Sequence, residues 1–389
     1  MREERCQPGV AGTQGLTLHL DCWLEHCRAR AMGASLDGGQ TVSDPHGAAT
    51  HGWLQPLRAE IEALLSNYSG KPILYVPNPG NAGDALIAVG TFQAFGRAGV
   101  PFEVADETTD VEGRVVFLGG GGNLVPLYED TARALARCIG RASEVVLLPH
   151  TVRGHEATLA RLDATCTVVC REPQSYAYVR AASLRARTVL AHDMAFHLDV
   201  WALLADSELA ARGQTLLDER LAGAGLDRAG LNALEVADFS RLDREAPEAR
   251  PSSLLDPSDM FAFGTGPVEA PLAAFCFLMT LRQARRIETD RLHVGLAAAV
   301  LGIPCEMRDN NYGKNAAVFA HSLAGRGTSV EFVASWRDAC RLARVELARL
   351  QRENKRLELE RWGAETEISR LRGRAMAAEA TLRSWCRDR

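Results

Sequence analysis

The sequence lacks an excess of positive charge, a long apolar run and the apolar core of a signal peptide. Its 389 residues carry a formal net charge of -5, which disfavours general binding to nucleic acid. The longest apolar runs, such as residues 294–305, are short and contain glycine, so we expect no membrane span. The N-terminal residues are of mixed charge. These features predict a cytoplasmic protein.

The sequence also lacks paired metal-ligand or disulfide motifs. None of its ten cysteines forms a Cys-x-x-Cys pair, and Cys166 and Cys170 lie in a strand-like apolar stretch. Buried free thiols in a reducing compartment are the better interpretation. There is no clustered His/Cys/Asp ligand set and no Gly-x-x-x-x-Gly-Lys-Ser/Thr loop. We therefore expect neither a metal nor a cofactor.

What the sequence does contain is an alternation of short apolar runs and helical patterns. Residues 1–52 show no sustained periodicity and are expected to be a largely disordered arm. From residue 53 onward, apolar runs at 73–76, 115–118 and 145–148 are separated by helical stretches. Continuous apolar runs of this length are typical of strands buried in a parallel sheet.

The alternation continues in a second part. It resumes at residues 167–170, is indistinct over 206–258, and returns with a strand at 286–289 followed by a helix. The expected fold class is therefore α/β, with two Rossmann-like domains, residues 53–165 and 166–330, that face a cleft. Ligands of such sheets bind beyond the carboxyl ends of the strands.

The last segment, residues 336–389, has a different pattern. Positions from 340 to 385 follow a strict 4-3 spacing, are mostly apolar and include Asn354, which predicts a coiled-coil helix whose buried amide fixes the register. The segment has 14 Lys/Arg and 9 Asp/Glu, a local charge of +5, so peripheral contact with a membrane is the alternative. We favour a homo-oligomer.

The first chemical motif is the glycine loop at residues 78–84, between a predicted strand and a predicted helix. Around Asn81 and Gly83, backbone N–H groups would meet the positive end of the helix dipole, which suits an anion. Asp84 is either a helix cap or a base that takes a proton from a sugar hydroxyl.

Two further motifs follow predicted strands. Four glycines at residues 119–122, including Gly121, precede Asn123 and indicate the close approach of a ligand. His150, Arg153 and Arg171 also stand at strand ends, where an arginine can hold a carboxylate or a phosphate with two parallel hydrogen bonds. Arg153 fits a solvated loop equally well.

The fourth motif covers residues 288–293. It places Arg291 and His293 at the entrance to a small-residue helix, where an anion would also meet the helix dipole. An isolated histidine is more often structural. Here, however, the later loop that contains Asn311 and Lys314 would converge on the same end of the sheet.

Together these segments resemble the polysaccharide pyruvyl transferase family. The resemblance spans residues 73–323 and is carried by the Gly-Asn-Ala-Gly-Asp-Ala-Leu-Ile, Arg-Glu-Pro-Gln-Ser-Tyr, Thr-Asp-Arg-Leu-His and Asn-Tyr-Gly-Lys segments. The last two are fairly specific when they occur together. The resemblance implies a fold similar to the GT-B glycosyltransferases and a site for phosphoenolpyruvate in the second domain.

The implied reaction forms a pyruvate ketal on a sugar of a polysaccharide or its precursor, as in exopolysaccharide biosynthesis. Phosphoenolpyruvate is the donor, a sugar or lipid-linked oligosaccharide is the acceptor, and phosphate is released. By position in the family motif, Arg291, Leu292 and His293 would contact phosphoenolpyruvate, and Arg171 would assist with its charge. We expect His293 to be the acid and Asp84 the base.

Two other functions are compatible with the same sequence. A GT-B-type glycosyltransferase would use a nucleotide sugar in the same frame, since one fold hosts many reactions. A non-catalytic scaffold in polysaccharide assembly would use the coiled coil to recruit partners. The presence of every charged motif residue counts against the scaffold.

Overall fold

The structure of the chain is a computed structural model. It describes residues 52–243, 245–246, 255–333, 354–358 and 361–379. The expected arm, apart from its last residue, lies outside the described residues. The chain divides into two compact units, Met1–Val333 and Ala334–Arg389.

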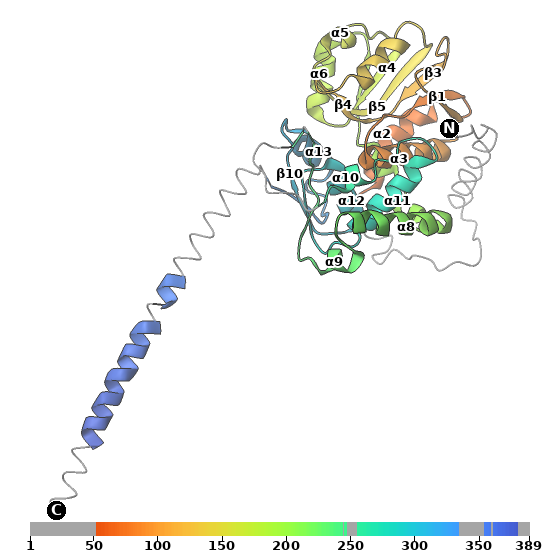
Figure 1. The fold of residues 1–389 in the computed structure, drawn as a ribbon. Helices are drawn as coiled ribbons and strands as arrows, with labels where there is room; N and C mark the ends of the chain where they lie inside the picture. Colours follow the sequence, from red (N-terminus) through yellow and green to blue (C-terminus); the bar gives the residue numbers. More distant parts are fainter. Residues whose placement is uncertain (1–51, 244, 247–254, 334–353, 359–360, 380–389) are drawn as a thin grey trace, which may run out of the picture. The chain divides into compact units, whose positions relative to one another are not determined.

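The first unit begins with a seven-stranded parallel sheet in the order β2-β1-β3-β5-β6-β7, with β4 paired to β5 (Figure 1). The strands are β1 (Ile73–Val76), β2 (Phe102–Val104), β3 (Val115–Leu118), β4 (Gly121–Leu124), β5 (Glu144–Val152), β6 (Cys166–Cys170) and β7 (Arg187–Leu190). The accompanying helices are α2 (Gln55–Ser66), α3 (Ala82–Ala98), α4 (Asp130–Cys138), α5 (Glu156–Leu159) and α6 (Pro173–Ala182). The apolar runs at 73–76 and 115–118 are confirmed as strands.

The expected domain boundary at residue 165 is wrong for this sheet. Strand β6 pairs in parallel with β5, Val145 opposite Cys166, and β7 pairs with β6. The first sheet therefore continues to Leu190. All five residues of β6 are buried, so the apolar run identifies a strand, but its pattern does not say which neighbour it pairs with.

A second parallel sheet follows, with four strands in the order β11-β10-β9-β8. The strands are β8 (Ala237–Asp238), β9 (Ile287–Thr289), β10 (Cys305–Arg308) and β11 (Val330–Val333). The helices of this part are α7 (Val200–Leu204), α8 (Ser207–Gly223), α9 (Arg228–Ala233), α10 (Pro257–Met260), α11 (Glu269–Leu281), α12 (Leu292–Leu301) and α13 (Lys314–Ser322). The fold is thus mixed α/β, with a parallel sheet of Rossmann-like character.

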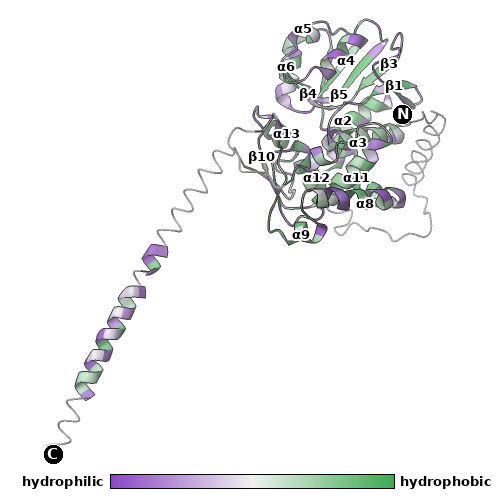
Figure 2. Ribbon diagram, viewed as in Figure 1, coloured by the Kyte–Doolittle hydropathy of each residue, from purple (hydrophilic) through white to green (hydrophobic). Residues whose placement is uncertain are grey.

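The two sheets share one hydrophobic core. Helix α3 of the first part packs against α11 of the second, and in Figure 1 α3, α11 and α12 lie next to one another. Helix α11 is apolar on almost every side, as Figure 2 shows, because it is buried between other helices. This shared core explains why residues Met1–Val333 form one compact unit instead of two. The GT-B arrangement stays a prediction.

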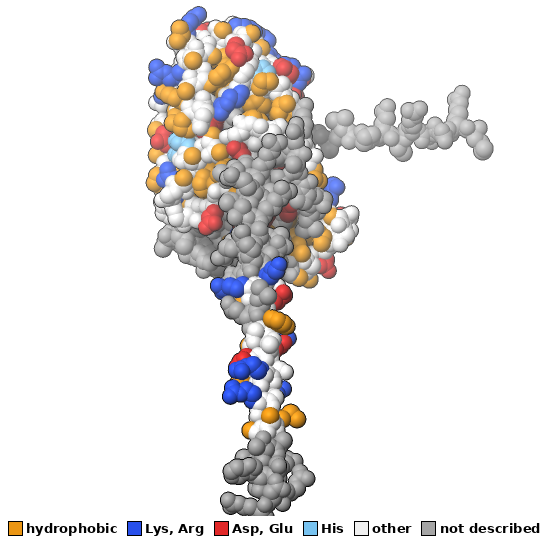
Figure 3. All heavy atoms as spheres, turned by 90° about the vertical axis from the view of Figure 1, so that its left-hand side faces the viewer, with side chains coloured by type: hydrophobic (Ala, Val, Ile, Leu, Met, Phe, Trp, Pro, Cys, Tyr) orange, Lys and Arg blue, Asp and Glu red, His pale blue; other side chains and the backbone are white. Residues whose placement is uncertain are grey.

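The second unit contains a helix over residues 354–358 and 361–379. Its apolar side chains Leu357, Ile368 and Leu371 are exposed, and Figure 3 shows hydrophobic and basic side chains close together on it. Asn354 donates from Nδ2 to Glu358 Oε1 of the same helix at 3.1 Å. The coiled coil remains a prediction, and its expected seam positions before 354 and after 379 lie outside the described residues.

No helix among the described residues is both long and apolar enough to cross a membrane.

Candidate functional site

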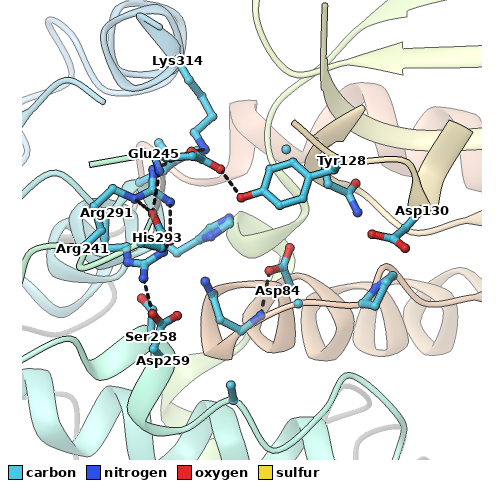
Figure 4. Close-up of a pocket in the computed structure, with 18 of the residues that line it drawn as sticks. Asp84, Tyr128, Asp130, Arg241, Glu245, Ser258, Asp259, Arg291, His293 and Lys314 are labelled. Carbon is cyan, nitrogen blue, oxygen red and sulfur yellow. Dashed lines mark hydrogen bonds and ion pairs between the residues drawn. The ribbon is translucent and has the colours of Figure 1, made fainter. Parts of the chain in front are cut away.

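A cavity of about 550 Å³ opens where the carboxyl ends of strands from both sheets meet. Figure 4 shows its side chains pointing toward a common space. It is lined by Pro79, Gly80, Asn81, Asp84, Gly122, Asn123, Tyr128, Asp130, Arg171, Arg241, Asp243, Glu245, Ser258, Asp259, Ala262, Arg291, Leu292, His293 and Lys314. Eight of the residues expected from sequence are among them. The location agrees with the rule for ligand sites in parallel sheets.

The chain brings these residues together because each follows a strand. Asp84 comes after β1, Arg171 directly after β6, His293 after β9 and Lys314 after β10. All strands within each sheet are parallel, so their carboxyl ends lie on one edge. The residues therefore reach one cavity although more than two hundred positions separate the first from the last.

Arg171 and Lys314 form a cationic end of the cavity. Arg171 is 1% exposed; its Nε donates to Thr151 Oγ1 at 2.9 Å and its Nη1 to Asp193 Oδ2 at 2.6 Å. A Cβ at Gly122 would come within 2.7 Å of Arg171 Nη2 and 3.5 Å of Lys314 Nζ. The missing side chain at Gly122 therefore leaves room in front of two cations, which is the arrangement that a doubly charged anion requires.

Lys314 begins helix α13 and is buried beside Glu245. Its Nζ donates to Glu245 Oε2 at 2.9 Å and lies over the ring of Tyr312. Burial lowers the pKa of Lys314 to about 8, although the Glu245 carboxylate acts in the opposite direction. Lys314 is thus a cation at neutral pH that loses its charge in mildly alkaline solution.

His293 lies in the first turn of α12. Its Nε2 is 3.6 Å from Asp193 Oδ2, the oxygen that also accepts from Arg171. No side chain caps the N-terminus of α12, so the unpaired backbone N–H groups of its first turn, at Leu292 and His293, can bind an anion. This helix terminus adds the positive end of a helix dipole to the lining of the cavity.

Asp84 lines the cavity and also caps helix α3. Its Oδ2 accepts from the backbone N–H of Asn81 at 3.0 Å and its Oδ1 from Asn78 Nδ2 at 3.2 Å, while Asn81 Oδ1 accepts from the N–H of Gly83 at 2.9 Å. This is a capping box. Burial raises the pKa of Asp84, and the nearby His293 opposes the shift. The two functions considered for Asp84 are therefore compatible.

Arg291 is surrounded by carboxylates. Its Nε donates to both oxygens of Asp256 at 3.1 and 3.0 Å, its Nη1 to Asp243 at 2.7 Å, and its Nη2 lies 2.9 Å from Asp259 Oδ2. All three guanidinium nitrogens are thus engaged. Arg291 lines the cavity as expected, but its guanidinium is paired with these three carboxylates and holds them in place.

Arg241 is a second arginine that is paired with the carboxylates on this side of the cavity. It forms ion pairs with Glu245 at 2.5 Å and with Asp243 at 3.0 Å. Tyr128, from the first part of the chain, donates to the other oxygen of Glu245 at 2.8 Å, a contact that Figure 4 shows across the cavity. In the same view Lys314 and Asp259 stand at opposite ends of the cavity.

Among the described residues, no group of three or more His, Cys, Asp or Glu could hold a metal ion.

Five expected residues lie outside the lining. His150 is buried and its Nε2 contacts Asn123 Oδ1 at 2.9 Å; burial, together with Arg171, lowers the pKa of His150 to about 3, which makes it a neutral support for Asn123.

The other four also lie outside the lining. Arg153 donates to Ser175 Oγ at 2.7 Å and pairs with Glu172. Asn311 donates its backbone N–H to the carbonyl of Glu245 at 3.4 Å. A Cβ at Gly121 would meet Asn78 Nδ2 at 2.5 Å, and a Cβ at Gly83 would meet His293 Nδ1 at 2.4 Å.

Several residues of the site were not predicted. Asp193, Tyr128, Asp130 and Asp259 carry no motif, and Arg241, Asp243, Glu245 and Ser258 lie in the stretch in which the sequence pattern was indistinct. Asp193 alone had a signal, because it follows the apolar run of β7 as Arg171 follows β6. The others reach the cavity through tertiary folding that periodicity does not encode.

The fold and the site define an α/β protein with a polar cavity at its strand ends, in which Arg171 and Lys314 lie side by side. A family model described as polysaccharide pyruvyl transferase matches residues 81–256. The resemblance read from the motifs is thereby confirmed over residues 81–256, and the matched family is a transferase family. The match includes Asp84, Arg171 and Asp193 but ends before Arg291 and His293.

Comparison with solved structures gives a related fold. A functionally uncharacterised protein from Klebsiella pneumoniae subsp. pneumoniae NTUH-K2044 is 25% identical in sequence, with a TM-score of 0.57. The alignment covers 72% of this chain and 99% of that protein. No curated protein matches the chain.

The contact between Gly83 and His293 yields a prediction about stability. Alanine normally stabilises a helix relative to glycine by about 0.5–1 kcal/mol. In Gly83→Ala the new Cβ would meet the imidazole of His293, so we expect a loss of about 1–3 kcal/mol in the free energy of unfolding, measured by denaturant titration.

The matched control is Gly223→Ala, at the end of α8, where a Cβ would meet nothing within 4 Å. The double variant Gly83→Ala/His293→Ala should recover most of the loss, because the clashing ring is gone. Equal effects of the two glycine substitutions would contradict the packing described here.

Proposed function

We propose that this chain transfers a pyruvyl group from phosphoenolpyruvate to a sugar of a polysaccharide or its precursor, forming a ketal and releasing phosphate. The observation that supports this most is the convergence of Arg171, Lys314, His293 and the N-terminus of α12 on one cavity. The match of residues 81–256 to the polysaccharide pyruvyl transferase family supports the same reaction.

Phosphoenolpyruvate carries a phosphate and a carboxylate, and the cationic end of the cavity suits both. The phosphate would lie in front of Gly122, within reach of Arg171 Nη2 and Lys314 Nζ. The carboxylate would accept from the backbone N–H groups that begin α12, at Leu292 and His293. Arg291 would contribute by positioning its acidic neighbours, since carboxylates occupy its nitrogens.

The chemistry needs one acid and one base. His293 gives a proton to the methylene carbon of phosphoenolpyruvate while a sugar hydroxyl adds to the adjacent carbon, and Asp84 accepts the proton of that hydroxyl. The bond from this carbon to the phosphate oxygen then breaks. A second hydroxyl of the same sugar closes the ketal, and its proton leaves with the phosphate. No cofactor is needed, because the donor supplies the leaving group.

The acceptor would occupy the opposite, acidic end. Asp243 and Asp259 are partly exposed there, and Ser258 lies beside them. Carboxylates accept hydrogen bonds from sugar hydroxyls and do not attract the anionic donor. Opposite polarity at the two ends would thus assign each substrate to its own part of the cavity. A lipid-linked oligosaccharide would present its terminal sugar in the same way.

The reaction is tested by measuring phosphate release from phosphoenolpyruvate with a panel of sugar acceptors. We expect acceptor-dependent release, and we expect His293→Gln to lower kcat by about 10²–10⁴-fold, since it removes the acid. The control His155→Gln changes a histidine outside the cavity and should keep the wild-type rate. Nucleotide-sugar turnover in place of phosphate release would favour glycosyl transfer.

A second prediction concerns pH. Because Lys314 has a lowered pKa of about 8 and binds as the ammonium form, kcat/KM for phosphoenolpyruvate should fall as the pH rises through that value. In Lys314→Arg, whose side chain stays charged, the part of this fall that Lys314 causes should move to higher pH, while the requirement for a protonated acid at His293 remains. An unchanged alkaline limb in Lys314→Arg would remove Lys314 from donor binding.

We further propose that the C-terminal helix mediates self-association. Ile368 and Leu371 occupy seam positions of the 4-3 pattern and are exposed in the single chain. The full-length double variant Ile368→Ser/Leu371→Ser should therefore shift the mass seen by light scattering toward a monomer while phosphate release continues. Met376→Ser, an exposed residue off the seam, is the control. Equal masses in all three proteins would exclude this seam, and vesicle binding without self-association would favour membrane contact.

A further inference from the structure

We propose that Asp193 is a positioning residue that links donor recognition to proton transfer by holding Arg171 and His293 through one carboxylate. This inference rests on the proposed function, and it concerns a residue that no sequence motif had singled out. Asp193 follows β7 and caps the short 3-10 helix η2 (Met194–His197) through Oδ1, which accepts from the N–H of Ala195 at 2.9 Å.

The other oxygen, Oδ2, is shared between two site residues. It accepts from Arg171 Nη1 at 2.6 Å and lies 3.6 Å from His293 Nε2. The Asp193 side chain is fully buried, and burial alone would raise the pKa of Asp193; the His293 contact and the Arg171 charge outweigh burial and hold this pKa below its usual range. Asp193 is therefore an anion throughout the neutral range, and it can only accept hydrogen bonds.

The Asp193 carboxylate beside Nε2 determines which nitrogen of His293 transfers a proton to the substrate. Nε2 is buried and has no hydrogen-bond partner within normal distance, so a small tightening toward Asp193, of the kind that substrate binding produces, gives it one. Nε2 then keeps its proton. The other nitrogen, Nδ1, faces Gly83 at the start of α3, where a glycine leaves room for it. With Nε2 held toward Asp193, Nδ1 is the nitrogen left to deliver the proton to the methylene carbon.

The proton balance is simple. The imidazolium form of His293 carries protons on both nitrogens; it loses the Nδ1 proton to the donor carbon and keeps the Nε2 proton toward Asp193. The charge lost at His293 leaves Asp193 paired with Arg171, so no buried carboxylate is left without a cation. Other titratable groups that act on this cluster from neighbouring elements are Asp84, His150, His192, His197 and Lys314.

The test is Asp193→Asn in the full chain. Asparagine keeps the Oδ1 contact to Ala195. Its amide N–H₂ group, however, takes the place of Oδ2 and can only donate, so it can no longer accept from Arg171 or His293. We expect kcat to fall by about 10²-fold. We also expect the alkaline limb of kcat against pH to move to lower pH, because the acid loses a carboxylate partner that favours its protonated form. A structural role alone would lower the rate without moving this limb.

Asp199→Asn is the matched control. Asp199 caps α7 by accepting from the N–H of Ala202 and does not line the cavity, so its variant should keep both rate and pH profile. If Asp193→Asn transfers pyruvyl groups with the wild-type profile, the inference is wrong while the proposed function stands. If the wild-type protein itself releases no phosphate with any acceptor, the proposed function fails instead.

A second measurement does not depend on activity or on the stability of a variant. Nitrogen-15 NMR of histidine-labelled wild-type protein, assigned with His293→Gln, reports which imidazole nitrogen is protonated in neutral His293. We expect the Nε2–H form. Finding the Nδ1–H form would overturn the proposed orientation whatever the variants do.

Discussion

The contact between Arg171 and Asp193 is the constraint on which the site depends. Both side chains are almost completely buried, and their nitrogen and oxygen are 2.6 Å apart. A buried ion pair of this kind gains little net stability, but removing one partner strands the other charge at a cost of about 3–5 kcal/mol. The pair also joins the end of β6 to the segment after β7. It therefore fixes the edge of the first sheet on which the cavity is built.

From this pair the electrostatics of the cavity follow. Asp193 neutralises one side of Arg171, so the guanidinium can stay charged in the interior while Nη2 faces the space before Gly122. Glu245 does the same for Lys314 and Arg241, and three aspartates do so for Arg291. A charged side chain can be buried without a large cost in free energy only when it has such a partner of opposite charge. The result is one end with available cations and one end with available carboxylates.

Much of the fold could be predicted from the sequence, because buried parallel strands leave continuous apolar runs. The strands at 73–76 and 115–118 have the expected bounds, and the helix after Arg291 begins at Leu292. The assignment of β6 and β7 to the second domain was wrong, since strand pairing depends on contacts that periodicity does not record. The glycines at 121 and 122, which were expected only to follow a predicted strand, belong to a strand of their own, β4, beside β5. Asp84, Arg171, His293 and Lys314 were found because they follow strands, whereas Asp243 and Ser258 lie where the pattern was indistinct.

Mass spectrometry of a sugar acceptor after incubation with phosphoenolpyruvate and the purified protein shows whether this cavity joins the two substrates. We expect an acceptor whose mass increases by one pyruvate minus one water, matched by an equal amount of free phosphate. An acceptor that stays unchanged with phosphoenolpyruvate but gains a sugar from a nucleotide sugar would rule out pyruvyl transfer.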